Sequence, residues 1–315
     1  MITMRVLSKT PRTLPLYARA AAAAIPGASL LPFLPGDEGE VPDVRLRLDG
    51  VRSDPGRLAL YSSVCGFPAS EHLPVTYPHT LAFPLHMTLL TDGHFPFGPI
   101  GLVHIENRIL QHRAIPLGEQ LDLRVRVTSA APHPRGSSFA LISDVRIAGE
   151  TVWESTSTML HRAPHPNGKQ HRAPRPEGDT QDVESGENAV RRETWTLPRD
   201  LGRRYAAVSA DRNPIHTHPL AARLLGFPGA IVHGMWTIAR TVAALGGELP
   251  DRHGIEGAFR KPIVVGATVQ LSSRTGDGET EFAVHDAERH VPHLRGRLWA
   301  LEPHHDATTT TRRGP

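Results

Sequence analysis

Apolar and polar residues alternate with period two in several short stretches of the chain, as in β-strands that bury one face. Val44-Arg-Leu-Arg-Leu and Leu121-Asp-Leu-Arg-Val-Arg-Val show the alternation most clearly. Further strands are expected at 103–107, 254–261, 268–273, 281–285 and 293–301, with a strand pair between 139 and 161. The chain is therefore expected to form a long antiparallel sheet.

Helical stretches lie between these strands. A surface helix is expected at 20–24, and the stretch 77–87 is expected to lead into a helix that ends at about 91. In the second half, helices are expected around 205 to near 211, at 220–225, and from 234 to about 245. Helices packed on an antiparallel sheet define the α+β class.

Two segments have a different composition. In the first, 161–188, His161-Arg-Ala-Pro-His-Pro recurs as His171-Arg-Ala-Pro-Arg-Pro among Gly, Asp, Glu and Gln. With so few apolar anchors, this segment is expected to be a flexible linker. The tail 303–315 is expected to be disordered. The remainder divides into an N-terminal unit, 1–160, and a C-terminal unit, 189–302, and 315 residues suit two such domains.

Composition excludes several classes of function. The net charge of +3 is nearly balanced, and aromatic residues are only 5%, so nucleic acid is not expected as a partner. Anionic ligands remain compatible with this charge. The uncharged run 20–36 is short and interrupted by three prolines, so no membrane span is expected. A single cysteine, Cys65, excludes an internal disulfide and suits a reducing, cytoplasmic setting.

The strongest chemical signal is Asp211-Arg-Asn213-Pro214-Ile-His216. Asn213 can cap a helix that begins at Pro214, where a missing N–H costs nothing. The residue before a proline avoids the α region, so the chain turns there and brings Asp211 close to His216. Such a pair can hold a water molecule and move its proton. The same residues are also compatible with an Asx-Pro turn beside a surface histidine.

This motif, preceded by Tyr205 and Ser209 and followed by Ile231-Val-His233-Gly234-Met235, resembles the MaoC-like dehydratases, the R-specific enoyl-CoA hydratase 2 group of hotdog folds. The resemblance implies that Asp211 and His216 form the catalytic pair and that the backbone N–H of Gly234 polarises the substrate carbonyl. One residue departs from the family, which usually has Ser-Gly-Asp where this chain has Ser209-Ala210-Asp211. A left-handed backbone there would strain alanine, whereas a right-handed one would accept it.

Four neighbours complete the expected site on its substrate-binding side. Asn213 is expected to cap its helix and to orient the pair, and His233 either contacts substrate or is simply packed. Ser209 and Tyr205 are expected to support the turn. The basic pairs Arg203-Arg204 and Arg260-Lys261 either meet phosphates of coenzyme A or form a solvated face.

A weak repeat links the two halves. Arg113-Ala-Ile-Pro-Leu-Gly118 resembles Lys261-Pro-Ile-Val-Val-Gly266, an offset of 266 − 118 = 148. The same offset carries Gly234 onto His86, and Asp211 and His216 onto Ser63 and Pro68, which cannot do acid–base chemistry. The chain is therefore expected to be a double hotdog, a pseudo-dimer within one chain that is a monomer or a homodimer, with the catalytic pair only in the second unit. Leu81, Phe83, Leu85, Met87 and Leu90 are candidates to line an acyl pocket, or to form plain core.

The resemblance implies a hydro-lyase that reversibly hydrates trans-2-enoyl thioesters of coenzyme A or acyl-carrier protein to (R)-3-hydroxyacyl thioesters by syn addition. The residues leave open whether Asp211 or His216 removes the proton. No cofactor and no metal are expected. Two alternatives stay open: a hotdog acyl-thioesterase, and a non-catalytic subunit that binds acyl thioesters.

Overall fold

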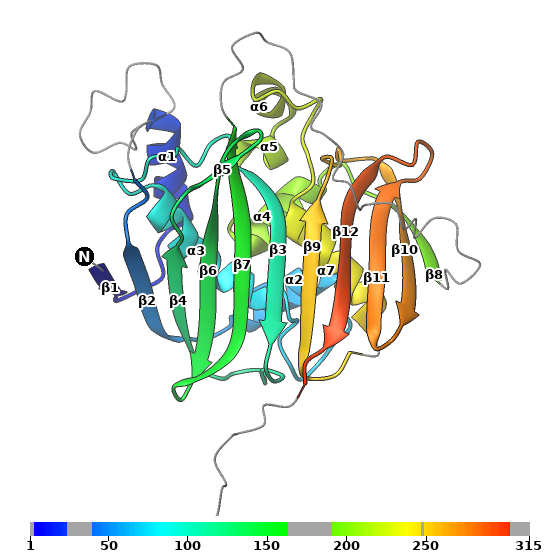
Figure 1. Ribbon diagram of the computed structural model, residues 1–315, viewed down its shortest axis with the longest axis horizontal. Coiled ribbons are helices and arrows are strands. Elements are labelled where there is room, and N and C mark those ends of the chain that lie inside the picture. The colour runs from blue at the N-terminus through cyan, green and yellow to red at the C-terminus, as the bar shows by residue number, and fades with distance from the viewer. Residues whose placement is uncertain (1–2, 24–39, 163–190, 247–248, 303–315) are drawn as a thin grey trace, which may run out of the picture.

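The fold is a single large sheet with helices on one side (Figure 1). The computed structural model describes residues 3–23, 40–162, 191–246 and 249–302. The strands are β1 (Thr3–Leu7), β2 (Val44–Val51), β3 (Val103–Gln111), β4 (Leu121–Val127), β5 (Ala131–His133), β6 (Gly136–Ile147), β7 (Glu150–Arg162), β8 (Arg191–Thr196), β9 (His253–Phe259), β10 (Thr268–Gly276), β11 (Glu279–Asp286) and β12 (Pro292–Ala300). All paired strands are antiparallel except β1 and β2.

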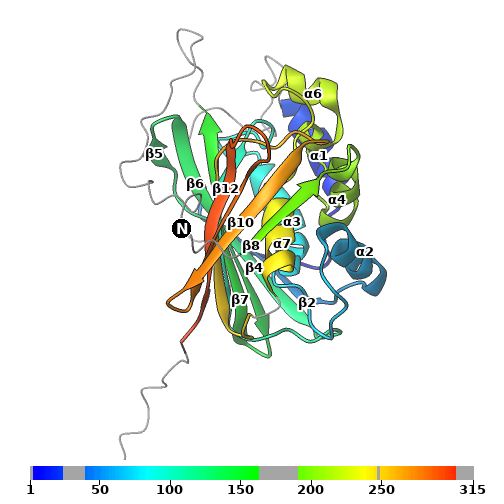
Figure 2. The same ribbon diagram turned by 90° about the vertical axis from the view of Figure 1, so that its right-hand side faces the viewer.

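The helices cover one face of this sheet, as the side view in Figure 2 shows. They are α1 (Thr13–Ala23), α2 (Pro55–Cys65), α3 (Tyr77–Leu90), α4 (Leu201–Ser209), α5 (Pro214–Thr217), α6 (Pro219–Leu224) and α7 (Gly234–Leu245). Helices α3 and α7 lie next to the sheet, and α2 packs outside them against α4 and α7.

The strand order repeats around the middle of the sheet. It runs β2-β4-β6-β7-β3 in the N-terminal half (residues 3–162) and β9-β12-β11-β10-β8 in the C-terminal half (191–302). In each half, the second of these strands along the chain, β3 or β9, lies at the middle of the sheet. These two strands pair with each other, and Ile109 lies opposite Ile255. The α+β double-hotdog prediction is confirmed. The predicted linker, from residue 163 on, and the tail 303–315 lie outside the described residues, so the predicted unit boundaries stay a prediction.

The central helices are apolar nearly all round because they are enclosed on all sides. In α3 only Phe83 and Thr88 are not buried, and α7 has eight buried residues. One hydrophobic core continues from the N-terminal half into the C-terminal half. The strands keep the alternation expected from the sequence: along β4, Leu121, Leu123, Val125 and Val127 are buried and the residues between them are not.

The structure lengthens two of the expected helices and adds a third. The predicted surface helix at 20–24 is the end of α1, in which Ala21 and Ala22 are exposed and Ala20 is buried because α1 packs on α3. The helix expected to end at about 91 is α3, which already starts at Tyr77, next to Pro78 in its first turn. Helix α2 was not expected at all.

The repeat offset of 148 also fails for the helices. The two central helices start at Tyr77 and Gly234, so their offset is 234 − 77 = 157, and His86 lies near the end of α3 instead of at its start. Helices α2 and α4 both end at a left-handed residue, Gly66 and Ala210, an offset of 210 − 66 = 144. At this offset His72 corresponds to His216, but Phe67 stands where the C-terminal half has Asp211. The strands do not keep one offset either: β4 and β10 start 268 − 121 = 147 residues apart, whereas β7 and β12 start 292 − 150 = 142 residues apart. Loops of different length in the two halves therefore shift the register.

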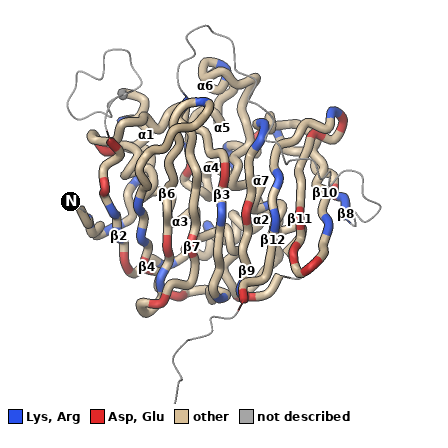
Figure 3. Tube along the Cα trace, in the orientation of Figure 1, with Lys and Arg blue, Asp and Glu red and all other residues tan. Residues whose placement is uncertain are grey.

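Charged residues of both signs are spread along the strands (Figure 3). Several form cross-strand or near-neighbour ion pairs, such as Arg297 with Glu256 and Glu279, or Arg47 with Asp49. None of the helices in the described residues has the length and apolar character needed to cross a bilayer.

Candidate active site

The predicted turn forms at the end of α4. Ala210 caps this helix in the left-handed region, with φ 65° and ψ 0°, so of the two backbone conformations considered for alanine the strained one is present. Asn213 then caps α5, its Oδ1 accepting a hydrogen bond from the Ile215 N–H at 3.3 Å, with Pro214 in the first turn. The local prediction from the Asn-Pro pair is confirmed.

Asp211 is held from several sides. Its backbone N–H donates to Ser209 Oγ at 3.2 Å, and its Oδ1 accepts from the Asn213 N–H at 3.1 Å. Oδ1 also accepts from the Tyr17 hydroxyl at 2.6 Å. Both hydrogen bonds to the carboxylate use Oδ1, whereas Oδ2 lies 3.9 Å from His233 Nε2 and remains for another partner. The side chain is 23% exposed, which leaves it accessible from the pocket.

His216 is oriented through one ring nitrogen. Its Nδ1–H donates to the carbonyl of Ile231 at 2.8 Å, which leaves Nε2 with a lone pair. Potential ligand atoms of Asp211, His216 and His233 all lie within 4.8 Å of one another. The structure thus brings Asp211 and His216 together at the distance at which one water molecule could contact both.

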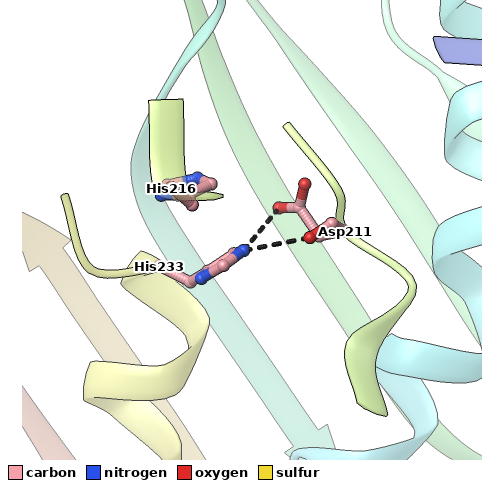
Figure 4. Close-up of side chains that lie close together, drawn as sticks. All are labelled: Asp211, His216 and His233. Atoms are coloured by element: carbon pink, nitrogen blue, oxygen red, sulfur yellow. Dashed lines mark hydrogen bonds and ion pairs between the residues drawn. The ribbon is translucent and has the colours of Figure 1, made fainter. Parts of the chain in front are cut away.

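His233 lies between these two residues and the start of α7 (Figure 4). Its Nε2–H donates to the backbone carbonyl of Asp211 at 3.1 Å and lies 3.9 Å from the carboxylate. Its ring stacks on His216, with 3.7 Å between centroids and 25° between planes, and the Tyr205 ring lies 4.9 Å away. His233 and Tyr205 are almost fully buried, so they support the pair from behind.

The electrostatics keep the carboxylate charged and the imidazoles neutral. Burial by itself raises the pKa of Asp211, but His233, His216, the Tyr17 hydroxyl and the Asn213 N–H together lower that pKa below its usual value. Burial lowers the pKa of His216, although Asp211 and the Ile231 carbonyl oppose it. Burial and His216 lower the pKa of His233 to about 3. At neutral pH the site therefore holds one carboxylate beside neutral rings.

Gly234 is the first residue of α7, with His233 at the N-cap. The first N–H groups of a helix have no partner within it, and the helix dipole makes this end positive. A Cβ on Gly234 would come within 2.7 Å of the Phe259 ring. Glycine therefore lets the Phe259 ring pack directly against the start of α7.

Both halves of the chain line the pocket at this site. It has a volume of about 190 Å³, far more than one water molecule occupies. Asp211, His216, His233, Gly234 and the other expected residues Tyr205, Ser209 and Asn213 all border it. Of the five apolar candidates in α3, Phe83, Met87 and Leu90 border the pocket, and Leu81 and Leu85 are core residues.

Sequence reasoning missed other residues of the pocket. Tyr17, from α1, bonds to Asp211, 194 residues away, and nothing in the sequence indicated this contact. His79, His86 and His104 line the N-terminal side of the pocket. Histidines are only sometimes buried, so nothing in the sequence placed these three inside the protein. Of the two basic pairs, Arg260 and Lys261 border the pocket; within the described residues, Arg203 and Arg204 do not.

Asp211, His216 and His233 could in principle hold a metal ion. However, Nε2 of His233 and Nδ1 of His216 are committed as donors to backbone carbonyls, so His233 would have to rotate or lose its hydrogen bond to become a ligand on that side. The hydrogen bonding fits an acid–base site better than a metal centre.

Comparison with known proteins identifies the family. Residues 181–295 match the profile of the MaoC like domain. Over 292 residues the chain is 34% identical to 3-hydroxyacyl-thioester dehydratase X of Mycobacterium tuberculosis, covering 90% of this chain and 96% of that protein. The chain belongs to the MaoC-like dehydratase family.

Solved structures of MaoC-like dehydratases have the same fold. A crystal structure of HtdX from Mycobacterium tuberculosis matches with a TM-score of 0.70 and 32% identity, over 82% of this chain and 100% of that one. A MaoC-like dehydratase from Phytophthora capsici matches with a TM-score of 0.65 at 19% identity, over 84% of this chain and 96% of that one, which shows the fold alone. Its 34% identity to a 3-hydroxyacyl-thioester dehydratase over 90% of the chain, together with its MaoC like domain, makes this protein a dehydratase, a hydro-lyase.

Proposed function

We propose that this dehydratase reversibly adds water to a trans-2-enoyl thioester and gives the (R)-3-hydroxyacyl thioester. One observation carries the proposal: Asp211, His216 and Gly234 border one pocket. His216 has a lone pair on Nε2, and Gly234 is the first residue of α7. The similarity to a protein named 3-hydroxyacyl-thioester dehydratase supports the thioester as substrate.

In the proposed mechanism each group has one task. The thioester carbonyl lies at the start of α7, where the Gly234 N–H and the helix dipole stabilise negative charge on its oxygen. A water molecule lies between Asp211 Oδ2 and His216 Nε2. An O–H bond of this water breaks, its oxygen bonds to Cβ, and the electron pair of the double bond moves through Cα toward the thioester oxygen. The proton taken by the pair returns to Cα on the same face, so atoms and charge balance.

Asn213, Ser209, Tyr205 and His233 act by holding the pair in place. Each contacts Asp211, His216 or each other within the site, and none needs to change its protonation state. Precise placement matters because general acid–base catalysis depends on the distance over which the proton moves.

The two halves divide the work in this proposal. The unit 189–302 supplies Asp211, His216 and Gly234, and the unit 1–160 supplies the wall of the acyl pocket through α3 and β3. The basic residues Arg135, Arg162, Arg260 and Lys261 border the same pocket and suit the phosphates of coenzyme A or of a carrier-protein arm.

Crotonyl-CoA tests the reaction. Hydration removes the enoyl absorbance without releasing thiol; a thioesterase would release free thiol, and a binding subunit would do neither. Because the proposed chemistry uses no cofactor or metal, the rate should be unchanged after dialysis against EDTA. Thiol release at a rate equal to or above that of enoyl loss would overturn the proposal.

A further inference from the structure

A row of histidines lines the part of the pocket that the N-terminal half provides. His79 and His86 come from α3 and His104 from β3, and all border the pocket of Asp211. The His79 ring lies 5.3 Å from that of His86 and 6.3 Å from that of His104, between centroids. His104 in turn lies 5.0 Å from the ring of Phe259, which stands in front of Gly234. The row therefore leads from the start of α7 into the N-terminal half.

Two of these histidines carry a nitrogen without a protein partner. His79 is only 7% exposed, and within the described residues its Nδ1 has no hydrogen bond. The same holds for Nε2 of His104. His86 differs, because its Nε2 is paired with Ser143 Oγ at 2.7 Å. Buried polar atoms are almost always paired, since an unpaired one loses its hydration and gains nothing. A partner from outside the protein would remove this cost.

The row is uncharged at neutral pH. Burial, together with the neighbouring imidazoles, lowers the pKa of His79 well below its usual value, that of His86 to about 3, and burial lowers that of His104 to about 4. A neutral imidazole offers one N–H and one lone pair. A hydroxyl group, which both donates and accepts, matches this pattern, whereas a carboxylate only accepts and would be left without a counter-charge.

We propose that the row formed by His79, His86 and His104 is a second recognition site, which binds a hydroxyl group on the acyl chain. The enzyme then prefers acyl thioesters that carry a hydroxyl beyond the enoyl group to unsubstituted chains of equal length. The apolar neighbours Phe83 and Met87 contact the methylene groups around it. This inference rests on the proposed function of the pocket.

The test compares kcat/KM for enoyl-CoA substrates of one length, unsubstituted or with the hydroxyl at successive carbons. The wild-type enzyme should favour one hydroxyl position by about fivefold to tenfold, the range for one hydrogen bond in a buried site. His79→Leu and, separately, His104→Leu should abolish this preference. His72→Leu, at an exposed histidine of the N-terminal half that does not border the pocket, is the matched control and should retain it.

Two results would overturn the inference: no position favoured by the wild type, or a preference that survives in both histidine variants. Binding of saturated hydroxyacyl-CoA and acyl-CoA, measured by calorimetry, gives the same ratio without turnover. Failure of the proposed function is therefore distinct, because it would abolish hydration of every substrate and leave the binding ratio measurable. If one histidine variant does not fold, the other decides the outcome.

Discussion

At the scale of single residues, Ala210 is the main departure from the family pattern. Its left-handed backbone, φ 65°, costs an L-residue about 1–2 kcal/mol. The conformation persists because Ser209 and Asn213 hold the following Asp211 on both sides. The protein therefore tolerates local strain at the residue that positions its carboxylate.

Ala210→Gly should stabilise the protein by about 0.5–1 kcal/mol, because the relief of strain exceeds the added entropy of the unfolded chain. Urea unfolding measures this difference, and hydration activity should stay within about twofold. Ala148→Gly is the matched control, since Ala148 also has positive φ (50°) but lies in the turn between β6 and β7, away from the pocket. A gain for Ala148→Gly with a loss for Ala210→Gly would show that the Ala210 methyl group contributes packing.

The acid–base pair gives the sharpest prediction at this scale. Asp211→Asn and His216→Gln should each lower kcat by at least about a hundredfold, the usual effect of removing a general acid or base. Thermal unfolding should show that both variants are folded. His218→Gln, two residues from the pair and without a side-chain cap hydrogen bond, should keep its activity. Near wild-type turnover in either site variant would contradict the assignment.

At the scale of elements, α1 contributes directly to the site. Its Tyr17 hydroxyl donates to Asp211 at 2.6 Å and helps to lower the pKa of that carboxyl group. Helix α1 also packs on α3, so the site carboxylate is linked to the N-terminal half by a helix far away in sequence.

Tyr17→Phe should lower kcat by about tenfold, the effect of one hydrogen bond to a charged group. Because the hydroxyl lowers the pKa of Asp211, its removal raises that pKa, and the acid limb of the kcat profile should move to higher pH. Leu14→Ala, on the same helix and 70% exposed, is the control and should leave the profile in place. An unmoved acid limb in Tyr17→Phe would mean that the hydroxyl only positions α1.

The start of α7 is the second element with a direct role. Gly234→Ala places a methyl group 2.7 Å from Phe259 and in the path of the carbonyl, so kcat/KM should fall at least about tenfold. Gly229→Ala, whose Cβ would meet Val264 at an ordinary 3.5 Å, is the control. In the double variant Gly234→Ala with Phe259→Leu, the packing is relieved and stability should recover without activity. Recovery of activity as well would reduce the role of Gly234 to packing.

At the scale of the whole molecule, the fold buries neutral histidines from both halves. Burial lowers the folded-state pKa of His79, His86, His104 and His233 below the usual 6.5. The unfolded chain binds protons at these residues below about pH 6.5 and the folded protein does not. Above pH 6.5 these histidines are neutral in both states, and their protonation does not lower the stability of the folded protein. As the pH falls from 6.5 toward the folded-state pKa values, protonation of the unfolded chain lowers the free energy of unfolding.

The free energy of unfolding should accordingly fall between pH 6.5 and 5, by up to about 1.4 kcal/mol per pH unit for each such histidine. Urea titrations at a series of pH values measure the slope. His86→Gln can keep a hydrogen bond to Ser143 but does not titrate, so its slope should be shallower than that of the wild type. Equal slopes for the two proteins would contradict the neutral state of His86.

Local signals in the sequence determined much of this protein. Period-two alternation located the long strands, and Asn213-Pro214 located the turn that brings Asp211 near His216, because both depend on residues close in sequence. Gly234 was correctly placed at a helix start for the same reason. The motif around these residues also indicated the family.

The tertiary structure alone decided how the site is completed. Tyr17 reaches Asp211 across 194 residues, and His79 and His104 enter the pocket because β3 pairs with β9 and α3 lies behind them. The conformation of Ala210 and the stacking of His233 on His216 also depend on these neighbours. Such contacts form only when the two halves pack around one hydrophobic core, and they cannot be predicted from the spacing of residues along the chain.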